Sequence, residues 1–193
     1  DKILNNPEMT FIGGGEESYG FLIGDFVRDK DANSACFMIA EIAAWAAEQN
    51  KTLYQILKEI YKEFGFYKEG LLSLTKKGIS GSEEIKNMMY RFRNDAPKEI
   101  LGSKIVEIKD YKTSICKDVA SGTETIIDLP KSDVLQFFTE DGTKISIRPS
   151  GTEPKIKFYF GIKAKLNNIA DFEVVNSELN NKINALIKLF SEE

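Results

Sequence analysis

The sequence contains no histidine, and this absence removes several kinds of catalytic centre. A Ser-His-Asp triad, a Cys-His pair and every zinc site with a His ligand need at least one imidazole. Only two cysteines are present, Cys36 and Cys116, which are too few for a disulfide framework. Cys36 stands in an apolar helical pattern, where we expect a small buried side chain. Cysteine usage of this kind fits a reducing, cytoplasmic setting.

Long apolar runs are also missing. The most apolar stretch, residues 35–47, already contains Glu41, and no run reaches the roughly 18 residues that mark a membrane span. We therefore expect no membrane partner. No signal peptide is visible, and because the chain begins at Asp1 rather than Met, we expect a fragment of a longer protein.

The chain has no excess of positive charge. Its 193 residues include 26 basic and 30 acidic side chains, a formal net charge of −4, which argues against wholesale nucleic-acid binding. That balance leaves room for a small anion held by a local cluster of Lys and Arg. The hydrophobic share of 42% is near the globular average, so the chain can bury one large core or two small ones.

The first third of the chain predicts a strand end, a glycine-rich loop and two helices, at residues 10–13, 13–20, 34–48 and 52–64. The first helix carries apolar side chains on nearly every face, so we expect it to be mostly buried. Thr52 and Gln55 have the spacing of a capping box at the start of the second helix. Gly65 stands just past its end, where glycine is common.

The remaining two thirds predict an α+β layer of strands with two helices on one face. Strands are expected at residues 71–75, 105–108, 134–138, 144–148 and 156–162, and helices at residues 82–92 and 172–190. Ser82 is expected to cap the first of these helices, and Asp141-Gly142 predicts a hairpin turn. Along the last strand, Lys157 and Tyr159 alternate with apolar residues and are expected to face away from them. The change of pattern near residues 65–70 predicts two domains, residues 1–67 and 68–193.

A first loop suited to chemistry covers residues 13–20 and reads Gly-Gly-Gly-Glu-Glu-Ser-Tyr-Gly. Glycines permit close approach to the backbone, and adjacent carboxylates and a hydroxyl are suited to sugar hydroxyls. A phosphate-binding P-loop is excluded, because Phe21 stands where that motif requires Lys. A plain glycine turn with solvated glutamates is the alternative.

A second loop reads Arg148-Pro-Ser-Gly-Thr-Glu-Pro-Lys155 between two expected strands. A phosphate dianion needs positive charge and several donors aimed at one point, which a guanidinium, two hydroxyls and a glycine-centred turn supply together. The two prolines stiffen the loop and lower the ordering cost of binding. The alternative is an ordinary hairpin connection, since Pro, Ser and Gly all favour turns.

A third element is the charged run Arg28-Asp-Lys-Asp31 just after the first loop. Mixed charge of this kind is typical of a solvated face. Because Lys30 follows the first loop closely, it is also a candidate for contact with a bound anion.

These stretches, in this order, make the chain similar to the C-terminal part of the α-D-phosphohexomutases. The resemblance is to the phosphoglucomutase/phosphomannomutase branch and spans nearly the whole chain. The matching stretches are Gly15-Glu-Glu-Ser-Tyr-Gly20, Val27-Arg-Asp-Lys-Asp31, Leu129-Pro-Lys-Ser132 and Lys144-Ile-Ser-Ile-Arg-Pro-Ser-Gly-Thr-Glu-Pro-Lys-Ile-Lys157.

The resemblance implies the helical tail of an α/β third domain, followed by a fourth α+β domain like the TATA-box-binding protein. It also implies roles for particular residues. Glu16 and Ser18 would bind hydroxyls of the sugar, and Lys30 would be a catalytic acid/base. Four residues would bind the phosphate that is not transferred: Arg148, Ser150, Gly151 and Thr152. The Glu-Glu-Ser order resembles the glucose-type loop and argues against an aminosugar mutase.

Two motifs of that family are missing from the sequence. In such enzymes a serine in a Thr-Ala-Ser-His-Asn-Pro-like loop is phosphorylated, and an Asp-Gly-Asp-x-Asp-Arg motif holds Mg²⁺; neither occurs here. The full-length parent is thus expected to be an isomerase that converts hexose 1-phosphate to hexose 6-phosphate with Mg²⁺ and a sugar bisphosphate activator. This chain is expected to lack metal ligands and to be inactive alone, its partners being the phosphosugar and the missing N-terminal domains.

Two other functions are compatible with the same sequence. One is an interaction or regulatory domain that kept the fold and lost catalysis, and the other is a piece of a phosphopentomutase-type parent. The sequence does not distinguish glucose, mannose and pentose phosphates, because one loop supplies the hydroxyl contacts and its approach angle depends on domains outside the chain.

Overall fold

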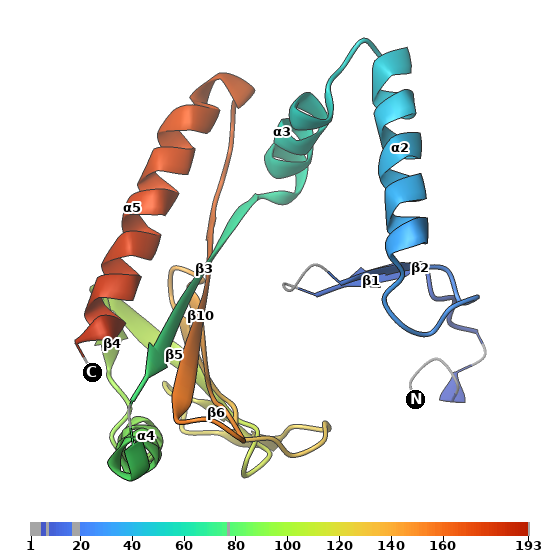
Figure 1. Cartoon of the computed structure of the whole chain (residues 1–193). Coiled ribbons are helices and arrows are strands. Elements are labelled where there is room, and N and C mark those ends of the chain that lie inside the picture. The colour runs from blue at the N-terminus through green and yellow to red at the C-terminus, as the bar shows by residue number, and fades with distance from the viewer. Residues whose placement is uncertain (1–4, 7, 17–19, 77, 193) are drawn as a thin grey trace. The chain divides into compact units, whose positions relative to one another are not determined.

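The computed structural model describes residues 5–6, 8–16, 20–76 and 78–192. The chain forms two compact units, Asp1–Ile60 and Tyr61–Glu193, both drawn in Figure 1. The boundary between the units falls inside helix α3 (Leu53–Phe64). The last turn of this helix belongs to unit 2, where the Tyr61 ring stacks on Phe66 with centroids 4.3 Å apart. The domain boundary expected after residue 67 stays a prediction.

Unit 1 contains a two-stranded antiparallel hairpin, β1 (Gly13–Gly15) and β2 (Phe21–Ile23). Its end is closed by the Glu16 N–H, which donates to the Gly20 carbonyl oxygen at 2.8 Å. The expected strand over residues 10–13 with a loop from Gly13 onward is therefore wrong. The glycines themselves form the strand, and the backbone hydrogen bonds to β2 stabilise it in place of side-chain packing.

Helix α2 (Ala32–Glu48) begins at Asp31, whose carboxylate accepts from Ser34 N at 3.0 Å. The expectation that this helix is mostly buried is wrong for the chain as it stands. Phe37 is 70% exposed and Trp45 51%, and Ala46 is its buried residue. A helix with apolar side chains on every face needs neighbours on every side, and the described part of unit 1 does not supply them. For the same reason the thiol of Cys36 is exposed rather than buried.

Helix α3 has the predicted signals at both ends. Thr52 N donates to Gln55 Oε1 at 2.7 Å, and Gln55 N donates to Thr52 Oγ1 at 3.2 Å, which is the reciprocal capping box. Gly65 follows the helix with φ +103°, a conformation that side chains disfavour.

Unit 2 is built on an eight-stranded antiparallel sheet with the order β3-β10-β9-β8-β5-β6-β7, in which β4 also pairs with β5. The strands are β3 (Phe66–Thr75), β4 (Glu99–Ile100), β5 (Ser103–Asp110), β6 (Ile115–Asp118), β7 (Glu124–Ile126), β8 (Leu135–Thr139), β9 (Lys144–Pro149) and β10 (Lys155–Ala164). At one edge of the sheet, β3 and β10 pair over the full length of both strands.

Helices α4 (Gly78–Asn94) and α5 (Phe172–Ser191) cover one face of this sheet, and a short 3-10 helix, η1 (Ile169–Asp171), leads into α5. Phe158 of β10 contacts both helices: its ring centroid lies 6.0 Å from that of Phe92 in α4 and 5.2 Å from that of Phe190 in α5. In Figure 1, α5 lies along β3 and β10. The predicted mixed α/β fold class, with strands and two helices on one face, is thereby confirmed.

Some predicted details of unit 2 are wrong. Helix α4 begins at Gly78, so Ser82 lies inside the helix and does not cap it. The short strands β4, β6 and β7 were not expected from the sequence. The turn at Asp141-Gly142 does join β8 to β9 as predicted, with φ +79° at Gly142.

Candidate functional site

The face of the sheet opposite the helices carries polar side chains from β9 and β10. Partners directly opposite in an antiparallel pair point to the same side of the sheet. Arg148 is opposite Lys157, and Ser146 is opposite Tyr159. Because Phe158 points to the helices, Lys157 and Tyr159 point to the other side, as the alternation predicts. We call this side the open face.

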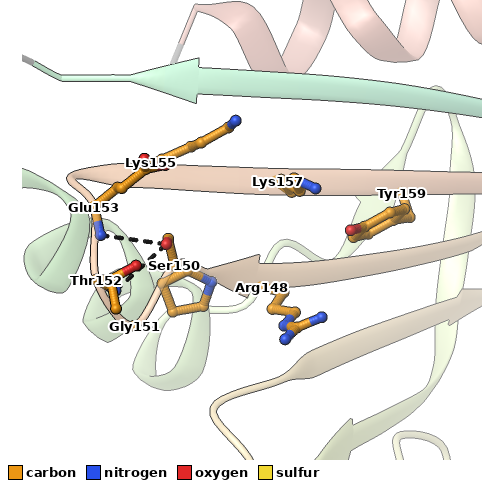
Figure 2. A pocket seen from close by; sticks show the side chains of 9 residues that line it. Arg148, Ser150, Gly151, Thr152, Glu153, Lys155, Lys157 and Tyr159 are labelled. Carbon is orange, nitrogen blue, oxygen red and sulfur yellow. Dashed lines mark hydrogen bonds between the residues drawn. The ribbon is translucent and has the colours of Figure 1, made fainter. Parts of the chain in front are cut away.

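The loop between β9 and β10 folds back over the end of the open face. Ser150 N donates to the Lys155 carbonyl oxygen at 2.7 Å, and Lys155 N donates to the Glu153 carbonyl oxygen at 2.8 Å. Ser150 Oγ accepts from Thr152 N at 3.4 Å and from Glu153 N at 3.3 Å, as Figure 2 shows. These hydrogen bonds engage the named N–H groups within the loop. The hydroxyls of Ser150 and Thr152 are the groups of the loop that can donate to an anion.

The loop and the strands beside it enclose a hollow of about 350 Å³. Its lining residues are Arg148, Pro149, Ser150, Gly151, Thr152, Glu153, Lys155, Lys157 and Tyr159 (Figure 2). Three of them are cations and one is an acid. None of the ion pairs found among the described residues involves Arg148, Lys155 or Lys157. Like charges directly opposite each other destabilise a sheet, so an anion bound between Arg148 and Lys157 would relieve their repulsion.

The structure thus brings together four residues singled out from the sequence: Arg148, Ser150, Gly151 and Thr152. Five other lining residues were not among the candidates: Pro149, Glu153, Lys155, Lys157 and Tyr159. The signal for the last two was present in the sequence, because they follow the loop at alternate positions of a strand. What was missing was the strand register that places Lys157 next to Arg148.

In unit 1 the structure brings Glu16 and Lys30 together. Lys30 Nζ lies 3.3 Å from Glu16 Oε1 and 3.3 Å from Asp29 Oδ1, and both pairs are solvent-exposed. The hydrogen bonds from Lys30 to Asp29 and then to Glu16 raise the pKa of the Lys30 ammonium above its usual value. Lys30 is therefore charged at neutral pH. Ser18, the third candidate of this unit, lies outside the described residues.

Gly20 makes the close approach of Glu16 and Lys30 possible. A Cβ atom at Gly20 would lie 2.6 Å from Glu16 Cγ, from Glu16 Oε1 and from Lys30 Cγ. Both side chains therefore cross directly over the Cα of this glycine. The requirement for glycine here is steric and does not come from a left-handed backbone conformation.

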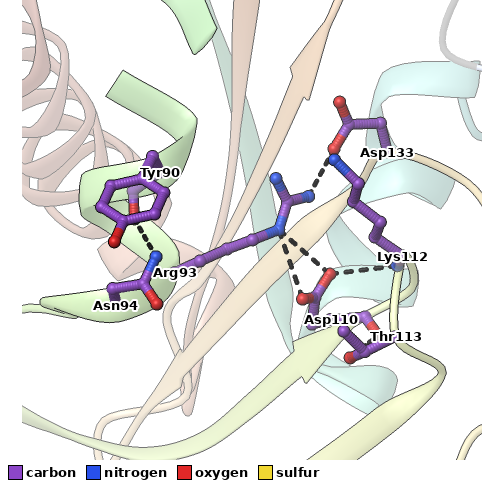
Figure 3. A network of polar contacts seen from close by, with 7 residues as sticks. All are labelled: Tyr90, Arg93, Asn94, Asp110, Lys112, Thr113 and Asp133. Atoms are coloured by element: carbon purple, nitrogen blue, oxygen red, sulfur yellow. Dashed lines mark hydrogen bonds and ion pairs between the residues drawn. The ribbon is translucent and has the colours of Figure 1, made fainter. Parts of the chain in front are cut away.

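The stretch Leu129–Ser132 lies in the connection between β7 and β8. Asp133, the next residue, pairs with Arg93 of α4, and Arg93 Nε also donates to Asp110 Oδ2 at 3.2 Å. Asp110 Oδ1 in turn accepts from Lys112 N at 3.0 Å, as Figure 3 shows. The Arg93 and Asp110 side chains are largely buried, so this network fixes the connection to the helix and does not present a reactive group.

The described residues contain no group of three acidic or Cys side chains placed to hold a metal ion. This part of the chain therefore does not fit a magnesium site. Within the same residues no helix is both long enough and apolar enough to cross a membrane.

Comparison with known proteins identifies the family. The family model for phosphoglucomutase/phosphomannomutase alpha/beta/alpha domain III matches residues 3–64, and the model for the C-terminal domain of the same family matches residues 102–176. Phosphoglucomutase of Staphylococcus epidermidis is 36% identical over 178 residues, which are 92% of this chain and 32% of that protein. Phosphoglucomutase of Staphylococcus aureus is 41% identical over 172 residues, 89% of this chain and 29% of that protein.

A solved structure supports the fold. The open form of pp63/parafusin, a phosphoglucomutase from Paramecium, superposes with a TM-score of 0.54 at 18% identity, over 96% of this chain and 32% of that one. The chain spans about a third of the length of the curated relatives that it matches. Because both models come from one family, the chain belongs to the phosphoglucomutase/phosphomannomutase family, and it matches domain III and the C-terminal domain of that family.

Proposed function

We propose that this chain is the substrate-recognition part of a phosphohexomutase that interconverts hexose 1-phosphate and hexose 6-phosphate. The observation that carries the proposal is the hollow at Arg148–Thr152. Three of its lining side chains are cations, and none of them takes part in an ion pair found among the described residues. A guanidinium outside the ion pairs of the described residues, together with two hydroxyls, matches the needs of a phosphate dianion. In this role the loop holds the phosphate that is not being transferred.

The hairpin of unit 1 has a complementary role in the proposal. Glu16 and Ser18 accept hydrogen bonds from sugar hydroxyls, and the Lys30 ammonium donates a hydrogen bond to the reacting phosphoryl group as the acid/base residue of the site. The pair between Lys30 and Glu16 supports this proposal, because it holds an ammonium and a carboxylate at one point. Electrostatic groups that are fixed before the reaction need no rearrangement during it.

The chemistry itself requires groups from outside this chain. A phosphoserine would give and recover the phosphoryl group through a bisphosphorylated sugar, and Mg²⁺ would supply charge stabilisation when bound by residues of the missing N-terminal domains. A bisphosphate would prime the serine. The exposed apolar side chains of α2 are consistent with a longer chain that covers them. We place the whole enzyme in the cytoplasm.

Phosphate binding to the chain tests the proposal. Backbone amide signals of Gly151 and Thr152, followed by NMR, are expected to shift on addition of inorganic phosphate. Arg148→Ala removes a charge-assisted hydrogen bond, which is worth about 1.5–3 kcal/mol, so the affinity is expected to fall about tenfold to a hundredfold. Arg148→Lys keeps the charge but not the planar fork, and recovers only part of the loss.

A charge-matched control separates a bound anion from a general effect of charge. Arg91→Ala removes an exposed guanidinium from helix α4 and is expected to leave phosphate binding unchanged. Equal phosphate affinity of the wild type and a folded Arg148→Ala variant would contradict the phosphate site and favour a plain hairpin connection.

A further inference from the structure

The hollow on the open face extends beyond the loop that we propose to hold phosphate. Its lining continues along β10 to Tyr159, whose ring lies past Arg148 and Lys157 when viewed from the loop in Figure 2. A volume of about 350 Å³ is within the range of sites for small organic ligands, about 300–1,000 Å³. One water needs only about 10–15 Å³ of such volume. The five heavy atoms of a phosphate would therefore leave much of the hollow unfilled.

The position of Tyr159 matches the reach of a group attached to that phosphate. The pair Ser146 and Tyr159 lies two residues along the strands from the pair Arg148 and Lys157. Two strand residues span about 7 Å. A sugar joined through one ester oxygen to a phosphate held at Arg148 and Lys157 would extend over the Tyr159 ring.

The surface around Tyr159 is held in place by a row of hydrogen bonds across the sheet. Ser146 Oγ accepts from Gln136 Nε2 at 2.9 Å, and Gln136 Oε1 accepts from Tyr111 Oη at 3.0 Å. Ser146 is only 9% exposed, and Tyr159 is half-buried on the same face. Such a floor is ordered before a ligand arrives, which lowers the cost of binding.

We propose that Tyr159 is a sugar-contacting residue of this site: its ring packs against the apolar face of the hexose while Arg148 and Lys157 hold the phosphate. The inference rests on the proposed function, because it takes the position of the phosphate from it. Aromatic rings combine a large apolar face with little conformational freedom. The contact makes the C-terminal domain selective for phosphate esters of sugars over inorganic phosphate.

The test compares two ligands on the intact chain. Inorganic phosphate and glucose 1-phosphate are titrated separately, and the shifts of the Gly151 and Thr152 amide signals give the two dissociation constants. We expect the wild type to prefer glucose 1-phosphate by roughly 3- to 10-fold, the size of a single aromatic packing contact. Tyr159→Leu, which keeps apolar bulk without a ring, is expected to remove this preference. Tyr159→Phe is expected to keep it.

Tyr67→Leu is the matched control. Tyr67 is opposite Lys163 on the open face, at the other end of β10, and is 57% exposed. This variant is expected to keep the wild-type preference. The role of the ring is overturned if the preference for glucose 1-phosphate persists in Tyr159→Leu. It is also overturned if Tyr159→Phe loses this preference as fully as Tyr159→Leu does. If the wild type binds no inorganic phosphate at all, the proposed function fails, and that outcome is distinct from the first two.

Discussion

The contact between Glu16 and Lys30 depends on the absence of a side chain at Gly20. Gly20→Ala places a Cβ 2.6 Å from both side chains, so we expect the two groups to separate. The pKa of Lys30, raised by Asp29 and then by Glu16, is expected to fall back toward 10.5 as the Glu16 contribution disappears. The measurement is the titration of the Lys30 Cε signal by NMR.

Gly14→Ala provides the control for this change. Its Cβ would meet the Phe11 ring at 3.6 Å, an ordinary contact, so the same hairpin receives a methyl group without a collision. The Lys30 titration is expected to match the wild type. If Gly20→Ala leaves the Lys30 pKa as high as Gly14→Ala does, then Gly20 does not position the pair.

Some residues of the site could be predicted from the sequence and others could not, because only some of them are neighbours in the chain. Arg148, Ser150, Gly151 and Thr152 are neighbours in sequence, so residue chemistry alone was enough to group them. The pairing of Lys157 with Arg148 depends on strand register, which is set by packing of the whole sheet. It could not be inferred from the loop by itself.

At the scale of elements, the carboxylate of Asp141 links the turn between β8 and β9 to helix α5 through an ion pair with Lys182. Asp141 Oδ1 accepts from Thr139 Oγ1 and Thr143 Oγ1, each at 2.7 Å, and Asp141 Oδ2 accepts from Lys182 Nζ at 2.6 Å. Partial burial alone would raise the pKa of Asp141. The hydrogen bonds from Lys182, Thr143 and Thr139 outweigh it and hold the pKa well below its usual value.

We expect Asp141→Asn to lower the free energy of unfolding at pH 7 by about 1–2 kcal/mol, a range reduced for partial exposure. A depressed carboxyl pKa stabilises the fold above the unfolded-state value of about 3.9. That stability is lost as the pH falls below this value. The difference between wild type and variant should thus shrink from pH 5 to pH 2.5, measured by urea unfolding. The exposed Asp128→Asn is the control, and a difference independent of pH would contradict the role of the ionised carboxylate.

The elements that were predicted correctly are those with a complete local sequence signal, such as apolar alternation or a capping motif. The alternation along β10 and the capping box of α3 are local signals, and both are confirmed. Strands β6 and β7 are short, and β7 is exposed throughout, so they lack the apolar alternation that marks a strand. For α2 the helix was predictable, but its burial depends on neighbours that the described residues do not provide.

For the whole molecule, we expect no mutase activity from the chain alone. It carries neither the serine loop nor the metal motif of the family. Conversion of glucose 1-phosphate to glucose 6-phosphate, with Mg²⁺ and glucose 1,6-bisphosphate present, should stay at background in a coupled dehydrogenase assay. Trace contaminating mutase is unaffected by substitutions in this chain, so Arg148→Ala serves as the control. Turnover that drops in Arg148→Ala would belong to the chain and would contradict this expectation.

The two units differ in how much apolar surface they bury. Among the described residues, the buried hydrophobic side chains of unit 1 are Ala46 and Ile56, whereas all the others lie in unit 2, including Phe137, Phe158 and Leu186 at 0% exposure. Local stability follows buried apolar contacts. Hydrogen exchange is therefore expected to be slow for the amides of β9 and β10. For the amides of α2 it is expected to be at least about a hundredfold faster, which corresponds to a difference of ~2.7 kcal/mol in the free energy of local opening. Comparable protection of α2 and β10 in the chain alone would show that unit 1 is stabilised by something other than its buried side chains.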